Sequence, residues 1–178
     1  GTEDKATVRI TYQGDTTYTE KENLAIQALG EILTLRLTEE LREKEGGVYS
    51  PGAYGMLNKI PSGSYVFATG FPCSPDNADK LIEITLAEIE KIKKDGPLAS
   101  DLDKFKEGEM TDYQKGIKEN RYWLNAFVES FNNQTPVEKA LDFEKNLKAL
   151  TAKDIQNAAN KFLTKNRVIS VLKPETAK

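Results

Sequence analysis

The stretch LREKEGGVYSP, residues 41–51, is where the sequence changes from a helical to a β pattern. Apolar residues recur at three- and four-residue intervals before it, which predicts a helix over about 20–44. Gly46 follows at the position where a left-handed glycine commonly ends a helix. Arg42 would then lie in the last helical turn and Tyr49 just inside the next strand. The sequence therefore predicts one tight corner with a long hydrogen-bond donor on each side.

Four segments have the pattern of β-strands. Residues 6–13 alternate apolar and polar side chains, which predicts a half-buried strand with one face in water. Residues 47–58 and 63–72 lie on either side of a short loop, which favours an antiparallel hairpin. Residues 167–172 form a compact β run near the end of the chain. The sequence thus predicts a mainly antiparallel sheet.

Helical patterns fill most of the chain between the hairpin and the last strand. One helix is expected within 74–97 and a second over 100–131, with a bend at one of its internal glycines. A capping box with proline in the first turn, residues 135–138, predicts a short helix to about residue 148. Another helix is expected from residue 151. Antiparallel strands with helices segregated to one side make an α+β two-layer domain, its sheet covered by helices on one face.

Length and composition indicate one globular domain. The chain has 178 residues, of which 38% are hydrophobic and 30% are charged, which is enough for a single buried core. Residues 1–5 are expected to be a disordered start with a tag-scar glycine, and residues 6–178 a single domain. The native protein would then be longer than this chain, with its targeting signal lost.

Charge and hydropathy exclude two classes of partner. The formal net charge is −3, which leaves no basic field for a phosphate backbone, so no nucleic-acid partner is expected. No run approaches the roughly 18 apolar residues of a membrane span. We therefore expect a protein that neither binds nucleic acid nor crosses a membrane.

The sequence contains no histidine and a single cysteine, Cys73. Catalytic zinc sites nearly always use imidazole, and general bases near neutral pH are usually histidines. A zinc site or a Ser-His-Asp triad therefore has no basis in this chain. Chemistry of its own would run on carboxylates, Lys, Tyr or Arg. Cys73 precedes a helix start, but without a histidine base it is expected to be a buried or bystander thiol.

Other clusters have ordinary structural explanations. Paired carboxylates lie on expected exposed helix faces among lysines, as in solvated i,i+4 pairing. Five aromatic residues recur at helical spacing and are expected in the core: Tyr113, Tyr122, Trp123, Phe127 and Phe131. On spacing alone, Arg42 and Tyr49 have explanations of the same kind. An Arg at a helix end usually pairs with the helix dipole or a carboxylate, and a strand Tyr usually packs.

Four stretches together resemble one family of enzymes. They are LREKEGGVYSP at 41–51, SPDNA at 74–78, KDGP at 94–97 followed by DLDKFK at 101–106, and NRVISVLKP at 166–174. Their order and spacing are similar to those in the C-terminal half of pitrilysin/insulinase-family zinc metallopeptidases, over nearly the whole chain. The resemblance implies an α+β fold similar to the metallohydrolase fold of the mitochondrial processing peptidase.

In that family, homologous α+β domains form a clamshell, and an inverted zinc motif, H-x-x-E-H, lies in the N-terminal half. This chain has no histidine and cannot carry the motif. The resemblance therefore implies the non-zinc C-terminal domain of a larger zinc-dependent metalloendopeptidase, inactive in isolation. Zinc is expected in the full-length enzyme and none in this chain. The implied partners are the N-terminal zinc-bearing domain, in the same or a partner chain, and a peptide substrate.

The resemblance also gives Arg42 and Tyr49 a role. It implies that both reach the substrate backbone and stabilise the oxyanion that forms when zinc-activated water attacks the scissile carbonyl. The neighbouring strands would receive the peptide in extended form at a sheet edge. The resemblance is to bacterial, envelope-associated members. It implies the bacterial periplasm or cell envelope as the location, with the cytoplasm as the alternative.

Two other functions fit the same residues. One is a catalytically inactive structural or scaffolding subunit of the same superfamily. The other is a plain α+β module that binds peptides without a catalytic partner. An H-x-x-E-H motif upstream in the same or a neighbouring gene would favour the peptidase over the scaffold.

Overall fold

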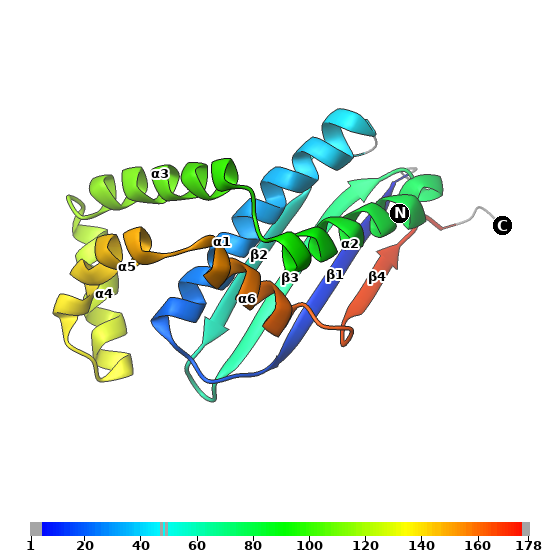
Figure 1. Ribbon diagram of the computed structural model, residues 1–178. Coiled ribbons are helices and arrows are strands. Elements are labelled where there is room, and N and C mark those ends of the chain that lie inside the picture. The colour runs from blue at the N-terminus through cyan, green and yellow to red at the C-terminus, as the bar shows by residue number, and fades with distance from the viewer. Residues whose placement is uncertain (1–4, 47, 49, 176–178) are drawn as a thin grey trace.

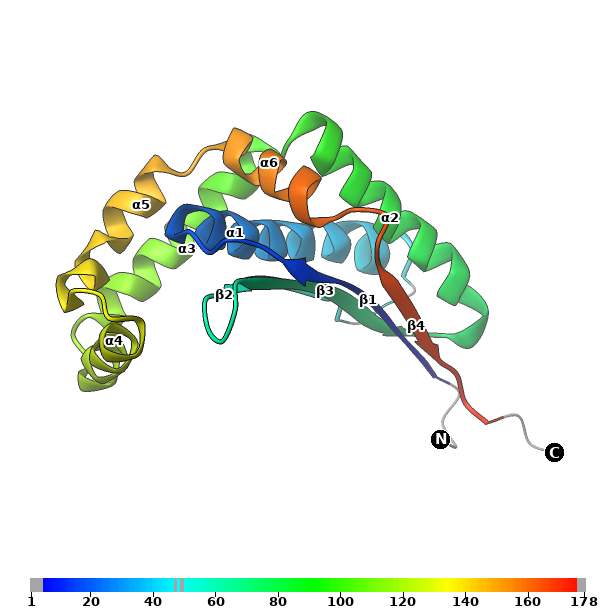
Figure 2. The ribbon, with the colours of Figure 1, turned by 90° about the horizontal axis from the view of Figure 1, so that it is seen from below.

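The protein forms a four-stranded sheet with helices packed on one of its faces (Figure 1 and Figure 2). The computed structural model describes residues 5–46, 48 and 50–175. The strands are β1 Ala6–Asp15, β2 Gly52–Asn58, β3 Ser64–Cys73 and β4 Val168–Leu172. They lie in the order β2-β3-β1-β4, and each neighbouring pair is antiparallel. The predicted α+β fold, with an antiparallel sheet covered on one side, is confirmed.

Helices make up most of the rest of the chain. Helix α1, Glu20–Leu37, continues directly into a π-helix, η1, Thr38–Lys44. The other helical elements are η2 Pro75–Asn77, α2 Ala78–Asp95, α3 Ala99–Gly116, α4 Asn120–Asn133, η3 Val137–Asp142, α5 Phe143–Ala149 and α6 Ala152–Phe162. Of the described helices, none is long and apolar enough to cross a bilayer.

Two helices begin at side-chain caps. The hydroxyl of Thr19 accepts a hydrogen bond from the Glu22 N–H at 3.1 Å, at the start of α1. Thr151 and Asp154 form a complete capping box, each side chain bonding the other residue's backbone N–H. The helix predicted from residue 151 is therefore confirmed, and its cap satisfies N–H groups that have no partner within the helix.

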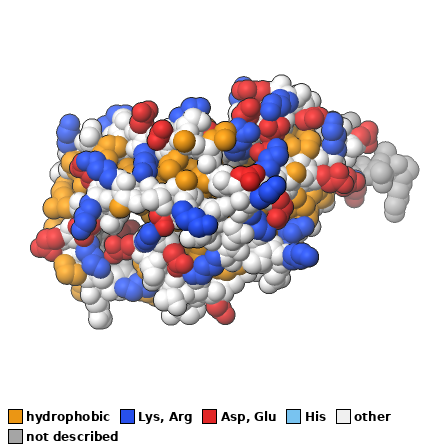
Figure 3. All heavy atoms as spheres, viewed as in Figure 1, with side chains coloured by type: hydrophobic (Ala, Val, Ile, Leu, Met, Phe, Trp, Pro, Cys, Tyr) orange, Lys and Arg blue, Asp and Glu red, His pale blue; other side chains and the backbone are white. Residues whose placement is uncertain are grey.

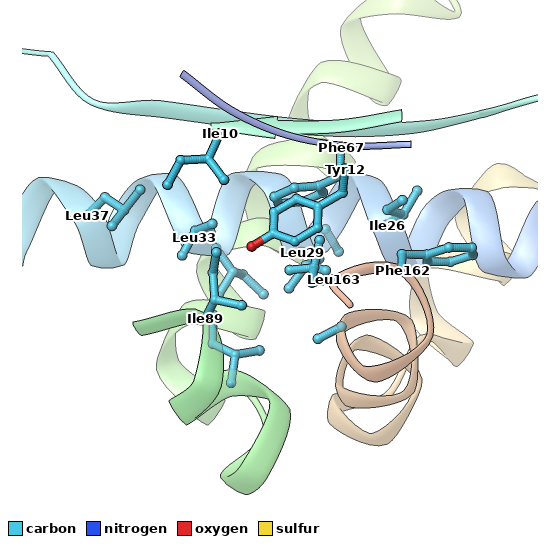
Figure 4. Packing of buried hydrophobic residues seen from close by; sticks show 14 of the residues in the cluster. Ile10, Tyr12, Ile26, Leu29, Leu33, Leu37, Phe67, Ile89, Phe162 and Leu163 are labelled. Carbon is cyan, nitrogen blue, oxygen red and sulfur yellow. The ribbon is translucent and has the colours of Figure 1, made fainter. Parts of the chain in front are cut away.

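The core lies between the sheet and helices α1, α2 and α6 (Figure 4). In β1, alternation places Val8, Ile10 and Tyr12 on the helix side, each at most 1% exposed. The ring of Tyr12 meets that of Phe67 in β3 edge-on, with centroids 6.3 Å apart. Leu33 of α1 packs on the same cluster and is fully buried. Each such side chain contributes about 1.5–3 kcal/mol when removed from water, so this layer holds the fold together.

Helix α1 lies very close to strand β2. At Gly30 a side chain would place its Cβ 2.8 Å from the backbone of β2, so this approach requires glycine. The Thr34 hydroxyl accepts a hydrogen bond from the Ala53 N–H at 2.8 Å, and Asn23 Oδ1 accepts one from the Leu57 N–H at 2.9 Å. Side chains of α1 therefore form hydrogen bonds with backbone groups of β2 that point away from β3.

The hairpin is confirmed, but its first strand is shorter than predicted. Strand β2 begins at Gly52 rather than near residue 47. Pro51 directly precedes it, and a proline cannot donate a backbone hydrogen bond to the ladder. The strand pairing therefore starts only after Pro51.

The prediction of one bent helix over 100–131 is wrong, because the chain forms α3 and α4 with a turn between them. The Glu119 N–H closes the turn on the Gly116 carbonyl at 2.8 Å. The indole N–H of Trp123 donates to the Ile117 carbonyl at 2.9 Å. That carbonyl would accept a bond from the next helical turn in a continuous helix, so the indole replaces a helical bond at the break.

The capping box predicted at residues 135–138 is also wrong. The segment opens as the 3₁₀ turn η3 at Val137, without a side-chain cap. The Thr135 N–H donates to the Ser130 carbonyl at 3.0 Å, and the Ser130 hydroxyl donates to the Thr135 carbonyl. These bonds make Thr135 part of the C-terminal turn of α4, so it does not cap the next helix.

The aromatic cluster predicted for the core divides into two groups. The rings of Tyr113 and Tyr122 are 6.0 Å apart and those of Tyr122 and Trp123 are 5.5 Å apart. The members of this first group are only half-buried, whereas Phe127 and Phe131 are 57% and 85% exposed. None of the five belongs to the buried core cluster, so the prediction is wrong. Helix α4 lies at the outer end of the molecule (Figure 2), where hydrophobic side chains reach the surface (Figure 3). The exposure of both rings means that no described element covers that side of α4.

Candidate functional site

The corner at residues 41–51 begins on the π-helix η1 rather than on the α-helix predicted there. Its wider hydrogen-bond ladder includes the bond from the Glu45 N–H to the Glu40 carbonyl at 3.3 Å. The Gly46 N–H then bonds the Arg42 carbonyl at 3.1 Å, and Gly46 has a φ of 64°. The predicted left-handed helix end is therefore confirmed. Single π-helical turns are frequent at functional sites.

The structure describes one of the two predicted site residues. Arg42 is exposed on η1, and its neighbour Leu41 is fully buried. The turn thus directs Leu41 into the core and Arg42 to the surface. Tyr49 lies outside the described residues. The proximity of Arg42 and Tyr49 stays a prediction.

A network of charges joins η1 to α2. Arg36, in the last turn of α1, contacts Glu39 at 2.6 Å and Glu40 at 3.4 Å. Its Nε lies 3.6 Å from Glu88 of α2, a residue that is only 2% exposed. Glu88 also accepts a hydrogen bond from Lys91. Because a buried carboxylate is costly without partners, this pairing ties Arg36, and with it the start of η1, to α2.

Two lysines hold the rest of η1. Lys44 donates a hydrogen bond to Glu40 at 2.8 Å, which lowers the pKa of Glu40 and raises the pKa of Lys44. Lys80 of α2 donates to Glu45 at 2.5 Å. Ion pairs therefore link both ends of η1 to α1 and α2, and the fully buried Leu41 packs the turn that carries Arg42 on the core.

The edge of β2 is occupied beside the corner. The backbone N–H groups of Ala53 and Leu57 already donate to Thr34 and Asn23 of α1. A peptide strand cannot pair with these two residues unless α1 moves. The expectation of strand addition next to the corner therefore lacks a free edge at these positions, and the opposite edge of the sheet belongs to β4.

The chemistry of this domain does not fit a zinc site. Within the described part of the chain, no group of three or more His, Cys, Asp or Glu side chains is placed to hold a metal ion. Cys73 is 6% exposed, and burial raises the pKa of its thiol. A buried, protonated thiol is a poor nucleophile and a poor ligand.

A second polar feature, which the sequence pattern did not single out, is the pair Arg9 and Tyr54. The Arg9 guanidinium donates to the Tyr54 hydroxyl at 2.8 Å on the open face of the sheet. The alternation of β1 correctly placed Arg9 on the wet face. Nothing local could connect it with a residue 45 positions further along the chain.

Comparison with known proteins identifies relatives at the level of sequence. A family model described as the peptidase M16 inactive domain matches residues 1–109. A zinc protease PQQL-like protein from Arabidopsis thaliana is 30% identical over 111 residues, which cover 60% of this chain and 12% of the relative.

Solved structures share the whole fold. The periplasmic protease PqqL from Escherichia coli matches with a TM-score of 0.84 at 20% identity, over 98% of this chain and 20% of that chain. The peptidase M16 inactive domain from Pseudomonas fluorescens matches with a TM-score of 0.80 at 19% identity, over 99% of this chain and 42% of that chain. At these identities the likeness shows the fold alone. This chain spans less than half the length of each of these relatives.

Proposed function

Because the chain belongs to the M16 peptidase family, as one of its inactive domains, we propose that it is the substrate-binding C-terminal domain of a zinc-dependent metalloendopeptidase. The resemblance to pitrilysin/insulinase-family metallopeptidases is thereby confirmed, and hydrolysis would belong only to the larger protein. In this proposal, Arg42 and Tyr49 donate hydrogen bonds to the substrate backbone and to the developing oxyanion.

The supported, outward position of Arg42 carries this proposal. Its turn is held by the Arg36–Glu88 contact at one end and by the Lys80–Glu45 pair at the other. A guanidinium presents its N–H donors in a rigid planar fork. Donors that are already in place before the reaction need no reorganisation when charge develops. An exposed Arg on a turn that packs on the core through Leu41 is therefore suited to a substrate that arrives from outside this domain.

Peptide hydrolysis converts the scissile carbonyl into a tetrahedral oxyanion. A donor aimed at this oxygen contributes about 3 kcal/mol to transition-state stability in a closed site. Zinc would supply the attacking water from another domain, since this chain has no histidine. The role left to Arg42 and Tyr49 is to hold the backbone and stabilise the negative charge. Backbone carbonyls are common to all peptides, so these two contacts would not select a sequence.

A second, zinc-bearing domain is part of the proposal. The chain covers 42% of the Pseudomonas fluorescens structure and 20% of PqqL, so both relatives contain further polypeptide. We place the zinc motif in an N-terminal domain of this kind, in the same chain or in a partner subunit. PqqL is described as periplasmic, which supports the bacterial periplasm or cell envelope as the location. Cell fractionation with an antibody to this domain would check it.

Substitutions in the complete peptidase test the roles of Arg42 and Tyr49. Arg42→Ala and Tyr49→Phe should each lower kcat by roughly 10²–10³-fold, because each removes an oxyanion donor. The measurement is steady-state cleavage of a quenched fluorescent peptide, with bound zinc determined on the same samples. Arg121→Ala is the control, since it removes an exposed Arg from α4. Near-normal turnover in both variants, with zinc retained, would exclude the roles assigned to them.

A scaffolding subunit of the same superfamily is the second candidate, and the outer side of α4 favours it. Leu124, Phe127, Val128 and Phe131 lie at i, i+3, i+4 and i+7, and each is at least half exposed. Contiguous exposed apolar side chains of this kind typically mark a protein contact. A purified assembly that contains this chain and cleaves none of a mixed peptide library, even after zinc is added, would favour the scaffold.

A further inference from the structure

The sheet face on which no described helix packs has a groove at one end. Figure 2 shows this face on the side of the sheet opposite the helices. The groove has a volume of about 460 Å³, and Gly52, Ala68, Gly70 and Pro72 are among the residues that line it. Gly52 and Gly70 lie opposite each other in the register of β2 and β3. Because these two neighbouring glycines have no side chains, the surface of the sheet is recessed between them.

Arg9 and Tyr54 form one side of the groove. Arg9 of β1 lies opposite Gly70, and Tyr54 of β2 lies opposite Ala68. Because these two β3 residues have little or no side chain, the Arg9 guanidinium reaches across β3 and donates to the Tyr54 hydroxyl at 2.8 Å. The Tyr54 side is open, with 49% of the residue exposed. The tyrosine therefore holds an accessible guanidinium in place beside the groove.

Arg9 has hydrogen-bonding capacity beyond this contact. A guanidinium has five N–H donors, and Tyr54 takes one of them. In residues 5–46, 48 and 50–175, no carboxylate forms an ion pair with Arg9. A guanidinium binds a carboxylate through two parallel charge-assisted bonds, and its weak hydration lets it do so beside an apolar surface. The groove thus combines an apolar lining with an anchored cation.

The groove lies at the end of the sheet next to the corner, because β2 starts at Gly52 directly after residues 41–51. We propose that it is a subsite for a carboxylate of the bound peptide, which Arg9 and Tyr54 receive. The carboxylate is either an acidic side chain or the peptide's C-terminal group, since both present the same two oxygens. The inference rests on the proposed function in one respect, namely that an extended peptide lies along the corner.

Direct binding to the 178-residue chain is the first test. The probes are the acetylated hexapeptide Ala-Leu-Ala-Gln-Leu-Ala with an amidated end, its Glu-for-Gln counterpart, and the Gln peptide with a free carboxyl end. Titration followed by ¹⁵N NMR should shift the amides of Arg9, Tyr54 and Gly70 with a carboxylate-bearing probe. The neutral probe should bind about tenfold more weakly, the effect of one charge-assisted contact.

The same titration distinguishes the two sources of the carboxylate. Binding of the Glu peptide alone identifies an acidic side chain as the ligand, and binding of the free-acid peptide alone identifies the C-terminus. Arg9→Gln should abolish the advantage of either one, Arg9→Lys should retain part of it, and Arg121→Gln should leave it unchanged. Equal affinities for all three probes, shifts that map elsewhere, or no binding at millimolar concentration would overturn the subsite.

Kinetics in the complete peptidase separate this proposal from the role of Arg42. Arg42→Ala should lower turnover of the Glu and Gln peptides by the same factor, whereas Arg9→Gln should lower kcat/KM about tenfold for the carboxylate-bearing peptide only. Arg9→Glu should shift the preference towards a Lys-containing peptide. An effect of Arg9 without one of Arg42 would leave the subsite standing and remove the oxyanion role. The reverse result would remove the subsite alone.

Discussion

The two-layer core, which consists of the sheet with α1, α2 and α6, contrasts with the arm formed by residues 99–149 (Figure 1). In α1, Leu29 and Leu33 belong to an apolar stripe and are fully buried. In α4, Leu124 and Phe131 belong to a stripe of the same spacing and are 63% and 85% exposed. Both helices thus carry apolar residues at helical spacing. Burial depends on whether a second layer lies against the stripe, and only α1 has the sheet beside it.

The arm is anchored at one end and loosely joined at the other. Phe105 of α3 is 3% exposed and belongs to the core cluster. Near α4, a cavity of about 440 Å³ separates the arm from the start of α1. Lys139 and Glu20 pair across this region at 3.2 Å, with each side chain 47% exposed. Such exposed pairs contribute at most about 1 kcal/mol, so the hold on the arm weakens from α3 towards α4.

The core and the arm should differ most in how much stability they lose when one aromatic side chain is replaced by alanine. Phe67→Ala removes a fully buried ring and should lower the free energy of unfolding by about 3–5 kcal/mol, through lost burial and a cavity. Phe131→Ala should change it by no more than about 0.5 kcal/mol, because that ring is already in water. Urea unfolding followed by circular dichroism measures both. A loss above 2 kcal/mol for Phe131→Ala would mean that α4 is covered in the isolated chain.

Replacing two helical glycines with alanine should change the stability of the protein in opposite directions. Gly30→Ala should destabilise the protein by about 1–3 kcal/mol, because its Cβ would meet the backbone of β2 at 2.8 Å. The added Cβ of Gly108→Ala in α3 meets no atom of the described residues within 4 Å, so the better helix former should stabilise the protein by about 0.5–1 kcal/mol. Thermal and urea unfolding of both variants provide the check. Stabilisation by Gly30→Ala would show that α1 and β2 separate more easily than their packing implies.

The free energy of unfolding should depend slightly on pH because of Glu109, which lies in the contact between α1 and α3. Burial, together with repulsion from Glu31 and Asp112, raises the pKa of Glu109. A raised folded pKa favours the protonated acid, so its contribution to stability is complete below the pKa of the unfolded chain, about 4.3. It is lost as the pH rises through the folded pKa. Glu109→Gln should therefore be more stable than the parent near pH 7 and lose this advantage towards pH 4.

The size of this effect is limited by solvent. Glu109 is half-buried, so water screens the repulsion, and a gain of about 0.5 kcal/mol is expected at neutral pH. Urea unfolding at several pH values between 4 and 7 measures it, with Glu107→Gln on the exposed side of α3 as the charge-matched control. If the difference in stability between Glu109→Gln and the parent stayed constant from pH 4 to 7, Glu109 would not be the titrating group.

Local pattern predicted the core well. Alternation in β1 correctly oriented Val8, Ile10 and Tyr12, and the glycine at 46 correctly ended the helix before the hairpin. These features depend on residues close in sequence, or on a sheet face that must be buried somewhere. The resemblance to the peptidase family rested on short motifs of the same kind, most of them in the span that the family model covers, residues 1–109.

The failures arise from specific hydrogen bonds and ion pairs that a periodic pattern of apolar residues does not encode. The break between α3 and α4 depends on the indole of Trp123 reaching the Ile117 carbonyl, which competes with a helical bond that the sequence alone favours. The expected cap at Thr135 was lost to Ser130 in the same way. At the site, the π-helical turn under Arg42 lies beside pairs such as Arg36 with Glu88, 52 positions apart. Periodicity carries no signal for contacts of that kind.

The side chains of Thr34 and Asn23 have a consequence for solubility. An exposed edge strand presents unpaired backbone groups that can recruit strands from other molecules and start aggregation. On β2, α1 covers such groups at Ala53 and Leu57. The other edge belongs to β4, which has only five residues, and short edge strands are poor templates. The first helix therefore protects the folded domain from intermolecular sheet growth on the longer edge of its sheet.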